Sequence, residues 1–166
     1  IKQPTDVDVI VQELGTDGIG QIPHFGKYLK PDIAVVTAVS EEHMEFFKTL
    51  DAVAHEELSA ANFSKSALIN RDDIDGVYAK DIINQNINTY GTNEVAEYRF
   101  ETSDYTYENG FTGAFSAPEW DDSVETILHL MGEHSIRPAV AAGAVGAKLG
   151  MTTQAIPTGT HTIRAA

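Results

Sequence analysis

The sequence predicts an α/β fold, with a mostly parallel sheet flanked by helices and a small antiparallel subsheet. In the first half of the chain, apolar segments of strand length alternate with segments of helical periodicity, which indicates βαβ units. In the second half, short alternating segments with turn residues between them indicate largely antiparallel strands. The chain has 166 residues, of which 42% are hydrophobic, so it suits one domain with its own core.

The first half is predicted to contain three strands and two helices. The strand at 31–39 is rich in β-branched residues, and the longer helix has Thr49 as its N-cap and one apolar face. That face consists of Leu50, Val53, Ala54, Leu58 and Ala61. The segments are, in chain order, strand 6–14, Gly-rich loop 15–20, helix 21–29, strand 31–39, helix 49–63 and strand 65–73.

The second half is predicted to contain short strands and one helix. The strands are expected at residues 87–91, 97–108, 110–117 and 123–131. The helix, residues 132–150, is rich in small residues that allow close packing, and Gly150 is expected to end it.

Composition restricts the possible partners. The chain carries 25 acidic and 11 basic residues, a net charge of −14, which repels phosphate backbones and argues against nucleic-acid binding. There is no cysteine, so disulfides and thiolate zinc sites are excluded, in agreement with a reducing compartment such as the cytoplasm. No apolar run approaches the length of a membrane span, and we expect no membrane partner.

Polar residues lie at the end of each predicted strand of the first half. Glu13 lies at the end of the first strand, His43 closes the segment after the second, and residues 70–73 ("NRDD") form the end of the third. Parallel sheets bind ligands at the carboxyl ends of their strands, so these side chains are candidates for one site. Glu13 is either a Mg²⁺ ligand or a strand-end residue that accepts bonds from loop amides. His43 is either a metal ligand or a structural residue in a turn.

Two further motifs are predicted to be turns. The loop "GTDGIG" lacks the G-K-[ST] ending of a phosphate loop and does not match a dinucleotide fingerprint. The segment "NRDD" fits an Asx-type turn or a polar ligand contact, and the turn is the favoured interpretation.

The order and spacing of these segments resemble a known family. The segments are "VIVQELGTDGIGQI", "KPDIAVVTAVSEEHMEFF", "TLDAVAHEEL", "ALINRDD" and "GEHSIRPAVAAGAVGAKLG". From about residue 6 to residue 150 the series is similar to the central, ATP-binding domain of the Mur ligase family, which includes the peptidoglycan amino-acid-adding ligases and folylpolyglutamate synthetase. The "G-x-G-x-I" and "H-M-E-F-F" runs look most like the branch that adds D-alanyl-D-alanine to a UDP-muramoyl tripeptide, with the tripeptide-forming branch close behind.

The resemblance implies a reaction, two cofactors and a set of partners. In this family ATP converts a substrate carboxylate to an acyl phosphate, and an incoming amine then displaces the phosphate. The protein positions the reacting groups, and Mg²⁺ neutralises their charge. The implied partners are a UDP-muramoyl peptide and an amino acid or dipeptide, and the implied location is the cytoplasm.

The resemblance also assigns roles to individual residues. Glu13 corresponds to the family glutamate that binds Mg²⁺ near the γ-phosphate, and His43 to the histidine at a second Mg²⁺, so these two are the expected catalytic residues. Glu57 stands where many members carry a carbamylated lysine, and it is either a third metal ligand or a solvated helix residue. His134 and Ser135 are the expected nucleotide-binding residues, because they lie in what is usually a G-x-H-N-x-x-N motif whose asparagines contact adenine.

Several positions depart from the family pattern. Ala38 stands in place of an asparagine, Glu57 in place of the lysine, and Thr160 near the arginine that usually opens the C-terminal domain. Ser135 and Pro138 stand in place of the two adenine asparagines. Ser still offers a hydrogen bond, whereas Pro has neither a polar side chain nor a backbone donor. These changes support a second hypothesis, a non-catalytic Mur-like domain that binds or acts as a scaffold.

The resemblance further implies a fragment of a three-domain ligase. We expect residues 1–156 to be a partial central domain whose phosphate loop lies upstream, and residues 157–166 to begin the linker to a C-terminal domain. Such a fragment is not expected to turn over ATP alone. The leading hypothesis for the full-length protein is an ATP-dependent amide-forming ligase of peptidoglycan precursor synthesis. A related ligase on another acid, as in folate polyglutamylation, is the third alternative.

Overall fold

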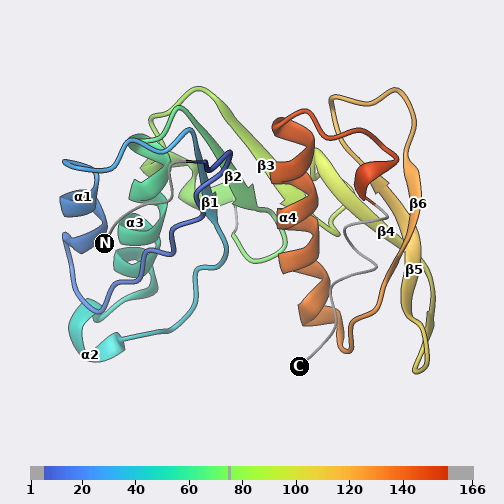
Figure 1. Ribbon diagram of the computed structural model, residues 1–166. Helices are drawn as coiled ribbons and strands as arrows, with labels where there is room; N and C mark the ends of the chain where they lie inside the picture. Colours follow the sequence, from blue (N-terminus) through green and yellow to red (C-terminus); the bar gives the residue numbers. More distant parts are fainter. Residues whose placement is uncertain (1–5, 75, 157–166) are drawn as a thin grey trace.

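A computed structural model describes residues 6–74 and 76–156 and confirms the α/β fold (Figure 1). One sheet has the strand order β1-β2-β3-β4-β5-β6. The strands are β1 (Ile33–Val36), β2 (Ser66–Asn70), β3 (Ile87–Gly91), β4 (Tyr98–Thr106), β5 (Gly110–Ser116) and β6 (Val124–Leu128). The helices are α1 (Gln21–Phe25), α2 (Met44–Phe47), α3 (Leu50–Asn62) and α4 (Ile136–Lys148), with 3₁₀ turns η1 (Gly76–Asp81) and η2 (Glu133–Ser135).

The sheet is parallel from β1 to β4 and antiparallel from β4 to β6. This confirms the predicted parallel sheet with an antiparallel subsheet. One direction was predicted wrongly, because β3 was grouped with the antiparallel strands and instead pairs in parallel with both neighbours. Tyr90 near the end of β3 pairs with Tyr98 at the start of β4, so the chain moves onward along the sheet and needs only a short loop.

Helices α3 and α4 cover opposite faces of the sheet. Ala67 and Ile69 of β2 belong to the core cluster under α3, whereas Leu68 between them belongs to the cluster under α4. Since neighbouring side chains of a strand point to opposite faces, β2 is buried on both sides along its whole length. The carboxyl end of β2 therefore has a fixed position between the two helices.

Both long helices have the features that the sequence predicts for them. Thr49 Oγ1 accepts a hydrogen bond from Ala52 N at 3.2 Å, so the predicted N-cap of α3 is confirmed. In α4, a Cβ added at Gly143 would lie 2.9 Å from the ring of Phe115, which shows how closely this helix approaches β5. Gly150 has a φ of 85° and follows the helix end, as predicted.

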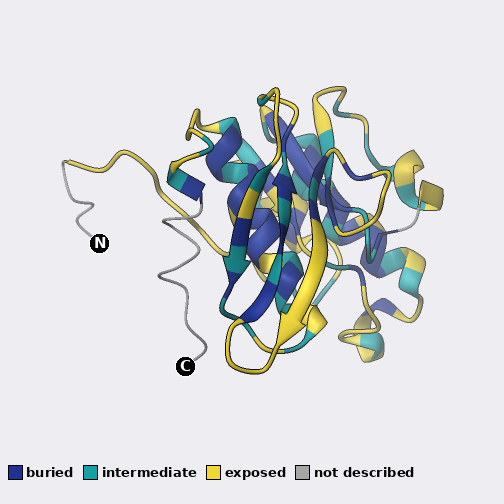
Figure 2. Cartoon of the chain, turned by 90° about the vertical axis from the view of Figure 1, so that its right-hand side faces the viewer, coloured by how far each residue is buried: buried dark blue, intermediate teal, exposed yellow. Residues whose placement is uncertain are grey.

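The antiparallel subsheet leaves one region exposed. Residues 101–109, at the end of β4 and in the turn to β5, are all exposed, and they form the yellow strand and turn of this hairpin in Figure 2. The other half of the hairpin, toward α4, contributes Phe111 and Phe115 to the core.

The segment 6–14 was predicted to be a buried strand, and this prediction is wrong. It is irregular and mostly exposed, with Val11 at 91% exposure. A strand requires a neighbour to satisfy its backbone N–H and C=O groups, and β1 pairs only with β2 among the described residues. The predicted linker at 157–166 lies outside the described part of the chain. None of the described helices is long and apolar enough to span a membrane.

Candidate functional site

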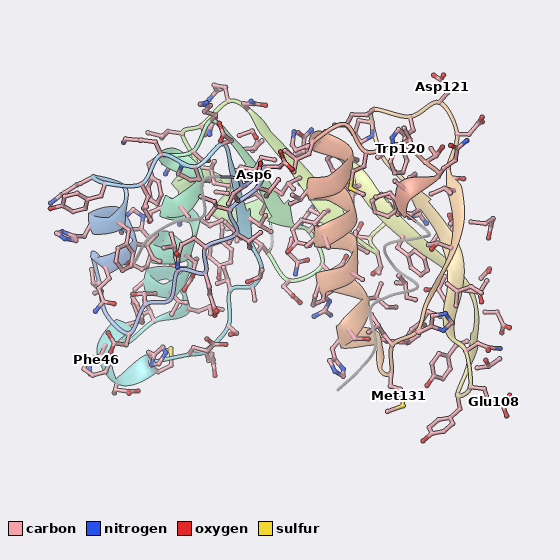
Figure 3. All side chains as sticks on the ribbon, in the orientation of Figure 1. Asp6, Phe46, Glu108, Trp120, Asp121 and Met131 are labelled. Atoms are coloured by element: carbon pink, nitrogen blue, oxygen red, sulfur yellow. The ribbon has the colours of Figure 1, made fainter. Side chains whose placement is uncertain are left out.

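The polar segments of the sequence meet at one end of the parallel strands, which we name the carboxyl edge. It comprises residues 37–43 after β1, residues 70–73 at the end of β2, residues 92–93 after β3, and the start of α4. In Figure 3, Phe46 of α2 and Met131, just before η2, lie at this lower end, while Trp120 and Asp121 lie at the opposite end. The carboxyl edge is therefore where a ligand of a parallel α/β sheet is expected.

Asn70 organises the centre of the carboxyl edge. Its side chain is buried, and its Nδ2 donates to Thr37 O at 2.6 Å and to Asp73 Oδ2 at 2.7 Å. Its Oδ1 accepts from Asp72 N at 3.0 Å, which is the predicted Asx-type turn. One amide thus fixes the segment after β1 relative to the segment after β2.

Asp72 and Asp73 connect this turn to β3 and to α4. Asp72 is 8% exposed and accepts from the backbone N–H groups of Thr92 at 2.8 Å and Asn93 at 2.8 Å. Arg137, in the first turn of α4, lies 2.7 Å from Asp73 and 3.9 Å from Asp72. The aspartates therefore join the ends of β2 and β3 to the start of α4.

The negative charges of these aspartates also act on Tyr90 in the core. Burial, and then the charges of Asp73 and Asp72, raise the pKa of the Tyr90 hydroxyl above its ordinary value, and Arg137 opposes this. Tyr90 therefore stays neutral, and its hydroxyl donates to Val36 O at 3.3 Å.

His43 and Glu57, two of the predicted metal ligands, lie within electrostatic range of each other. His43 is exposed and caps α2 with a φ of 51°, in the left-handed region. Glu57, on α3, is partly buried, and burial followed by the charges of Glu42 and Glu56 raises its pKa. The charge of His43 opposes that rise. This part of the carboxyl edge has an excess of negative charge.

Glu13, the third predicted metal ligand, is exposed in the irregular segment before the Gly-rich loop. Gln12 Nε2 donates to its carbonyl oxygen at 2.8 Å. Within residues 6–74 and 76–156, no group of three or more His, Asp or Glu side chains is arranged to hold a metal ion. The assignment of Glu13, His43 and Glu57 as metal ligands stays a prediction.

The two residues predicted to bind a nucleotide lie at the start of α4. His134 is exposed in η2, and Ser135 Oγ donates to Gly132 O at 2.7 Å. A hollow of about 510 Å³, within the usual size of small-molecule pockets, opens beside them between α4 and the β4–β5 hairpin. Its lining residues are Thr92, Thr102, Tyr105, Phe111, Gly132, Glu133, Ile136 and Arg137.

Sequence reasoning missed Arg137, which carries the ion pairs of the carboxyl edge. A signal for it does exist. A cation in the first turn of a helix is unfavourable beside the positive end of the helix dipole, so an arginine there implies carboxylate partners from another segment.

Comparison with known proteins places this architecture in a family. A family model described as Mur ligase middle domain matches residues 2–146. A UDP-N-acetylmuramate–L-alanine ligase of Salinibacter ruber is 30% identical over 138 residues, covering 81% of this chain and 28% of the relative. A UDP-N-acetylmuramoyl-tripeptide–D-alanyl-D-alanine ligase of Escherichia coli is 27% identical over 169 residues, covering 99% of this chain and 37% of the relative.

Solved structures agree on the fold. The crystal structure of MurF ligase from Thermotoga maritima in complex with ADP superposes with a TM-score of 0.67 and 22% identity, over 90% of this chain and 34% of that one. The chain thus spans about a third of the length of the proteins that it matches. On the match of its sequence over residues 2–146, this chain belongs to the Mur ligase family, as a middle domain.

Proposed function

We propose that the chain is the middle domain of an ATP-dependent ligase that forms an amide bond on a UDP-muramoyl peptide through an acyl phosphate. The observation that carries this proposal is the family match over nearly the whole chain, together with polar segments gathered at the carboxyl edge. The named relatives are ligases that act on UDP-linked muramoyl substrates. Use of ATP and a UDP-linked substrate implies that the protein is cytoplasmic.

The proposal gives Mg²⁺ to Glu13, His43 and Glu57. The surroundings of Glu57 support this. Burial, followed by the charges of Glu42 and Glu56, raises its pKa, and a cation there would favour the ionised carboxylate. Mg²⁺ is usually held by one or two carboxylates, substrate phosphates and water rather than by a complete protein cage. The proposal needs no protein-only group of three ligands, because it gives one Mg²⁺ to Glu13 and a second to His43 and Glu57. When bound, Mg²⁺ would neutralise the phosphate charge that develops during transfer.

The proposal gives the nucleotide to the start of α4, at His134 and Ser135. The Ser135 hydroxyl donates to Gly132 O, and its oxygen can still accept a bond from a ligand. The Thermotoga maritima neighbour was solved with ADP, which supports a nucleotide as the ligand.

The substrate branch that we favour is addition of D-alanyl-D-alanine to a UDP-muramoyl tripeptide. The runs "G-x-G-x-I" and "H-M-E-F-F" support this branch, as does the Escherichia coli relative that aligns with 99% of the chain. The Salinibacter ruber relative bears the name of an L-alanine ligase, so the amine is the part of the proposal that the assay must decide.

A second candidate is a Mur-like domain that binds ligand without catalysis. Pro138 favours it, because α4 offers no polar side chain or backbone donor at that position. Ala38 at the carboxyl edge also lacks a polar side chain.

The test is phosphate release by the full-length protein with ATP, Mg²⁺, UDP-muramoyl tripeptide and D-alanyl-D-alanine. We expect release only when the dipeptide is present, and a loss of about 100-fold or more in Glu13→Ala and in His43→Ala. Glu108→Ala, at the exposed turn between β4 and β5, is the control and should retain full activity. If both Glu13→Ala and His43→Ala retain activity, the metal assignment is wrong. Release triggered by another amine would point to another ligase of the family, and no release with any amine would favour the binding domain.

A further inference from the structure

A buried carboxylate in the middle of α3 has no role in the proposed chemistry. Glu56 is 1% exposed, although its neighbours on the buried face of the helix are apolar. Its Oε1 accepts from Ile22 N at 2.6 Å and its Oε2 accepts from Gly20 N at 2.7 Å. Burial of a carboxylate is costly unless such charge-assisted bonds compensate for it. The two bonds therefore compensate for the burial of the Glu56 carboxylate at this position.

One bond ends on Gly20, the last residue of the Gly-rich loop that follows Glu13, and the other on Ile22 in the first turn of α1. Within this loop, Asp17 N donates to Gln21 Oε1 at 3.1 Å and Gln21 Nε2 donates to Asp17 Oδ1 at 2.7 Å. Ile22, directly after the loop, is 1% exposed. The loop is thus a small hydrogen-bonded unit, and Glu56 fastens that unit to α3.

The next residue of α3, Glu57, interacts with the segment that contains His43. Consecutive residues of a helix point about 100° apart, so Glu56 and Glu57 face different neighbours. Glu56 accepts bonds from Gly20 and Ile22, whereas the carboxylate of Glu57 interacts electrostatically with Glu42 and His43. Two adjacent residues of α3 therefore interact with the two chain segments that carry the predicted ligands.

We propose that Glu56 is a positioning residue that fixes the loop at residues 15–20, and through it Glu13, relative to the segment of His43. The importance of this position for metal binding rests on the proposed function, whereas the attachment of the loop to α3 does not. With Glu56 changed, Gly20 and Ile22 lose their bonds to α3, and the loop that leads from Glu13 to α1 loses this attachment to the helix that carries Glu57.

Hydrogen exchange of the full-length protein, followed by mass spectrometry, tests the attachment. In Glu56→Ala we expect the amides of Gly20 and Ile22 to exchange about 10- to 100-fold faster than in wild type. In Glu56→Gln the exchange rates should lie between those of wild type and Glu56→Ala, because the amide oxygen of Gln accepts one bond while its NH₂ group meets a donor. His55→Ala, an exposed neighbour on α3, is the control and should leave the loop unchanged.

Unchanged loop exchange in both Glu56 variants would overturn the proposal. If Glu56→Ala fails to fold, Glu56→Gln against His55→Ala decides the question. For the metal, phosphate release is measured against Mg²⁺ concentration. In Glu56→Gln we expect the Mg²⁺ concentration that gives half the maximal rate to rise about 10-fold, while the rate at saturating Mg²⁺ changes little. If that concentration does not change, the positioning of Glu13 by Glu56 is refuted. If wild type releases no phosphate, the proposed function fails, and the exchange experiment still decides whether Glu56 holds the loop.

Discussion

Removal of the Arg137 guanidinium should weaken the carboxyl edge by a small and defined amount. Arg137→Met keeps most of the aliphatic stem and deletes the ion pairs to Asp73 and Asp72. Exposed ion pairs contribute about 0.2–1 kcal/mol, and breaking a fully buried pair costs about 3–5 kcal/mol. Arg137 is 40% exposed and Asp73 25% exposed, which places this pair between the two limits.

Two features move the expected value toward the lower limit. Asp73 keeps its bond from Asn70, and Asp72 keeps its bonds from the backbone after β3, so neither carboxylate is left without a donor. The variant also recovers about 0.3–1 kcal/mol, because it removes a cation from the first turn of α4. We expect a net loss of about 1 kcal/mol in the free energy of unfolding, and a fall of about 2–4 °C in Tm.

Urea denaturation at low and high salt measures this loss. Lys65→Met is the matched control, because Lys65 Nζ lies 2.6 Å from Asp32 but both side chains are more than 75% exposed. We expect no measurable change in this control. Equal losses in the two variants would refute the reasoning, because the reasoning assigns the difference to burial. A loss in Arg137→Met that exceeds about 3 kcal/mol would show that the aspartates depend on Arg137 alone.

Two further variants test the electrostatics and the packing. Burial, followed by the charges of nearby carboxylates, raises the pKa of Glu57 above its ordinary value of 4.5. The folded state therefore holds the ionised side chain less favourably than the unfolded state does, and stability is lost as the pH rises from 4.5 through the raised pKa. Glu57→Gln should therefore unfold at a higher temperature than wild type at neutral pH, and Tm values measured against pH should converge below 4.5; a constant difference would contradict this cause. Gly110 has a φ of 83°, and a Cβ there would lie 2.1 Å from Leu128 O. Gly110→Ala should cost about 1–3 kcal/mol in urea denaturation, whereas Gly15→Ala, which meets open space, should be near neutral.

The elements that sequence predicts well are those with local causes. The helix α3 begins after Thr49 because the hydroxyl caps it, and it buries Val53, Ala54, Leu58 and Ala61 on the face that helical periodicity predicts. Strand β2 was predictable for the same reason, as a short run of apolar residues that ends in an Asx turn.

The elements that it predicts poorly depend on partners elsewhere in the chain. Residues 6–14 have the pattern of a strand, but a pattern does not supply the neighbouring strand that pairs with it. The direction of β3 depends on where β4 starts relative to it, which the register of Tyr90 against Tyr98 determines. Neither fact is visible within the segment itself.

The same distinction holds for the candidate site. Residues 70–73 were identified because the turn lies within one segment. The ion pair of Asp73 with Arg137, and the bonds of Glu56 to Gly20 and Ile22, join segments that are distant in sequence. Glu56 could have been suspected from its place beside apolar helix positions, where an unpaired carboxylate is costly.

The charge of the carboxyl edge restricts the form in which a phosphate ligand can bind there. Glu42, Glu57, Asp72 and Asp73 place acidic groups along it, in a chain whose net charge is −14. Two unit charges about 4 Å apart interact with about 4 kcal/mol near a protein surface, so a free triphosphate meets repulsion that Arg137, already paired with aspartates, does not offset. A triphosphate that carries Mg²⁺ brings the missing positive charge with it. The proposed ligand is therefore the magnesium complex of ATP, and nucleotide affinity should fall steeply as Mg²⁺ is removed.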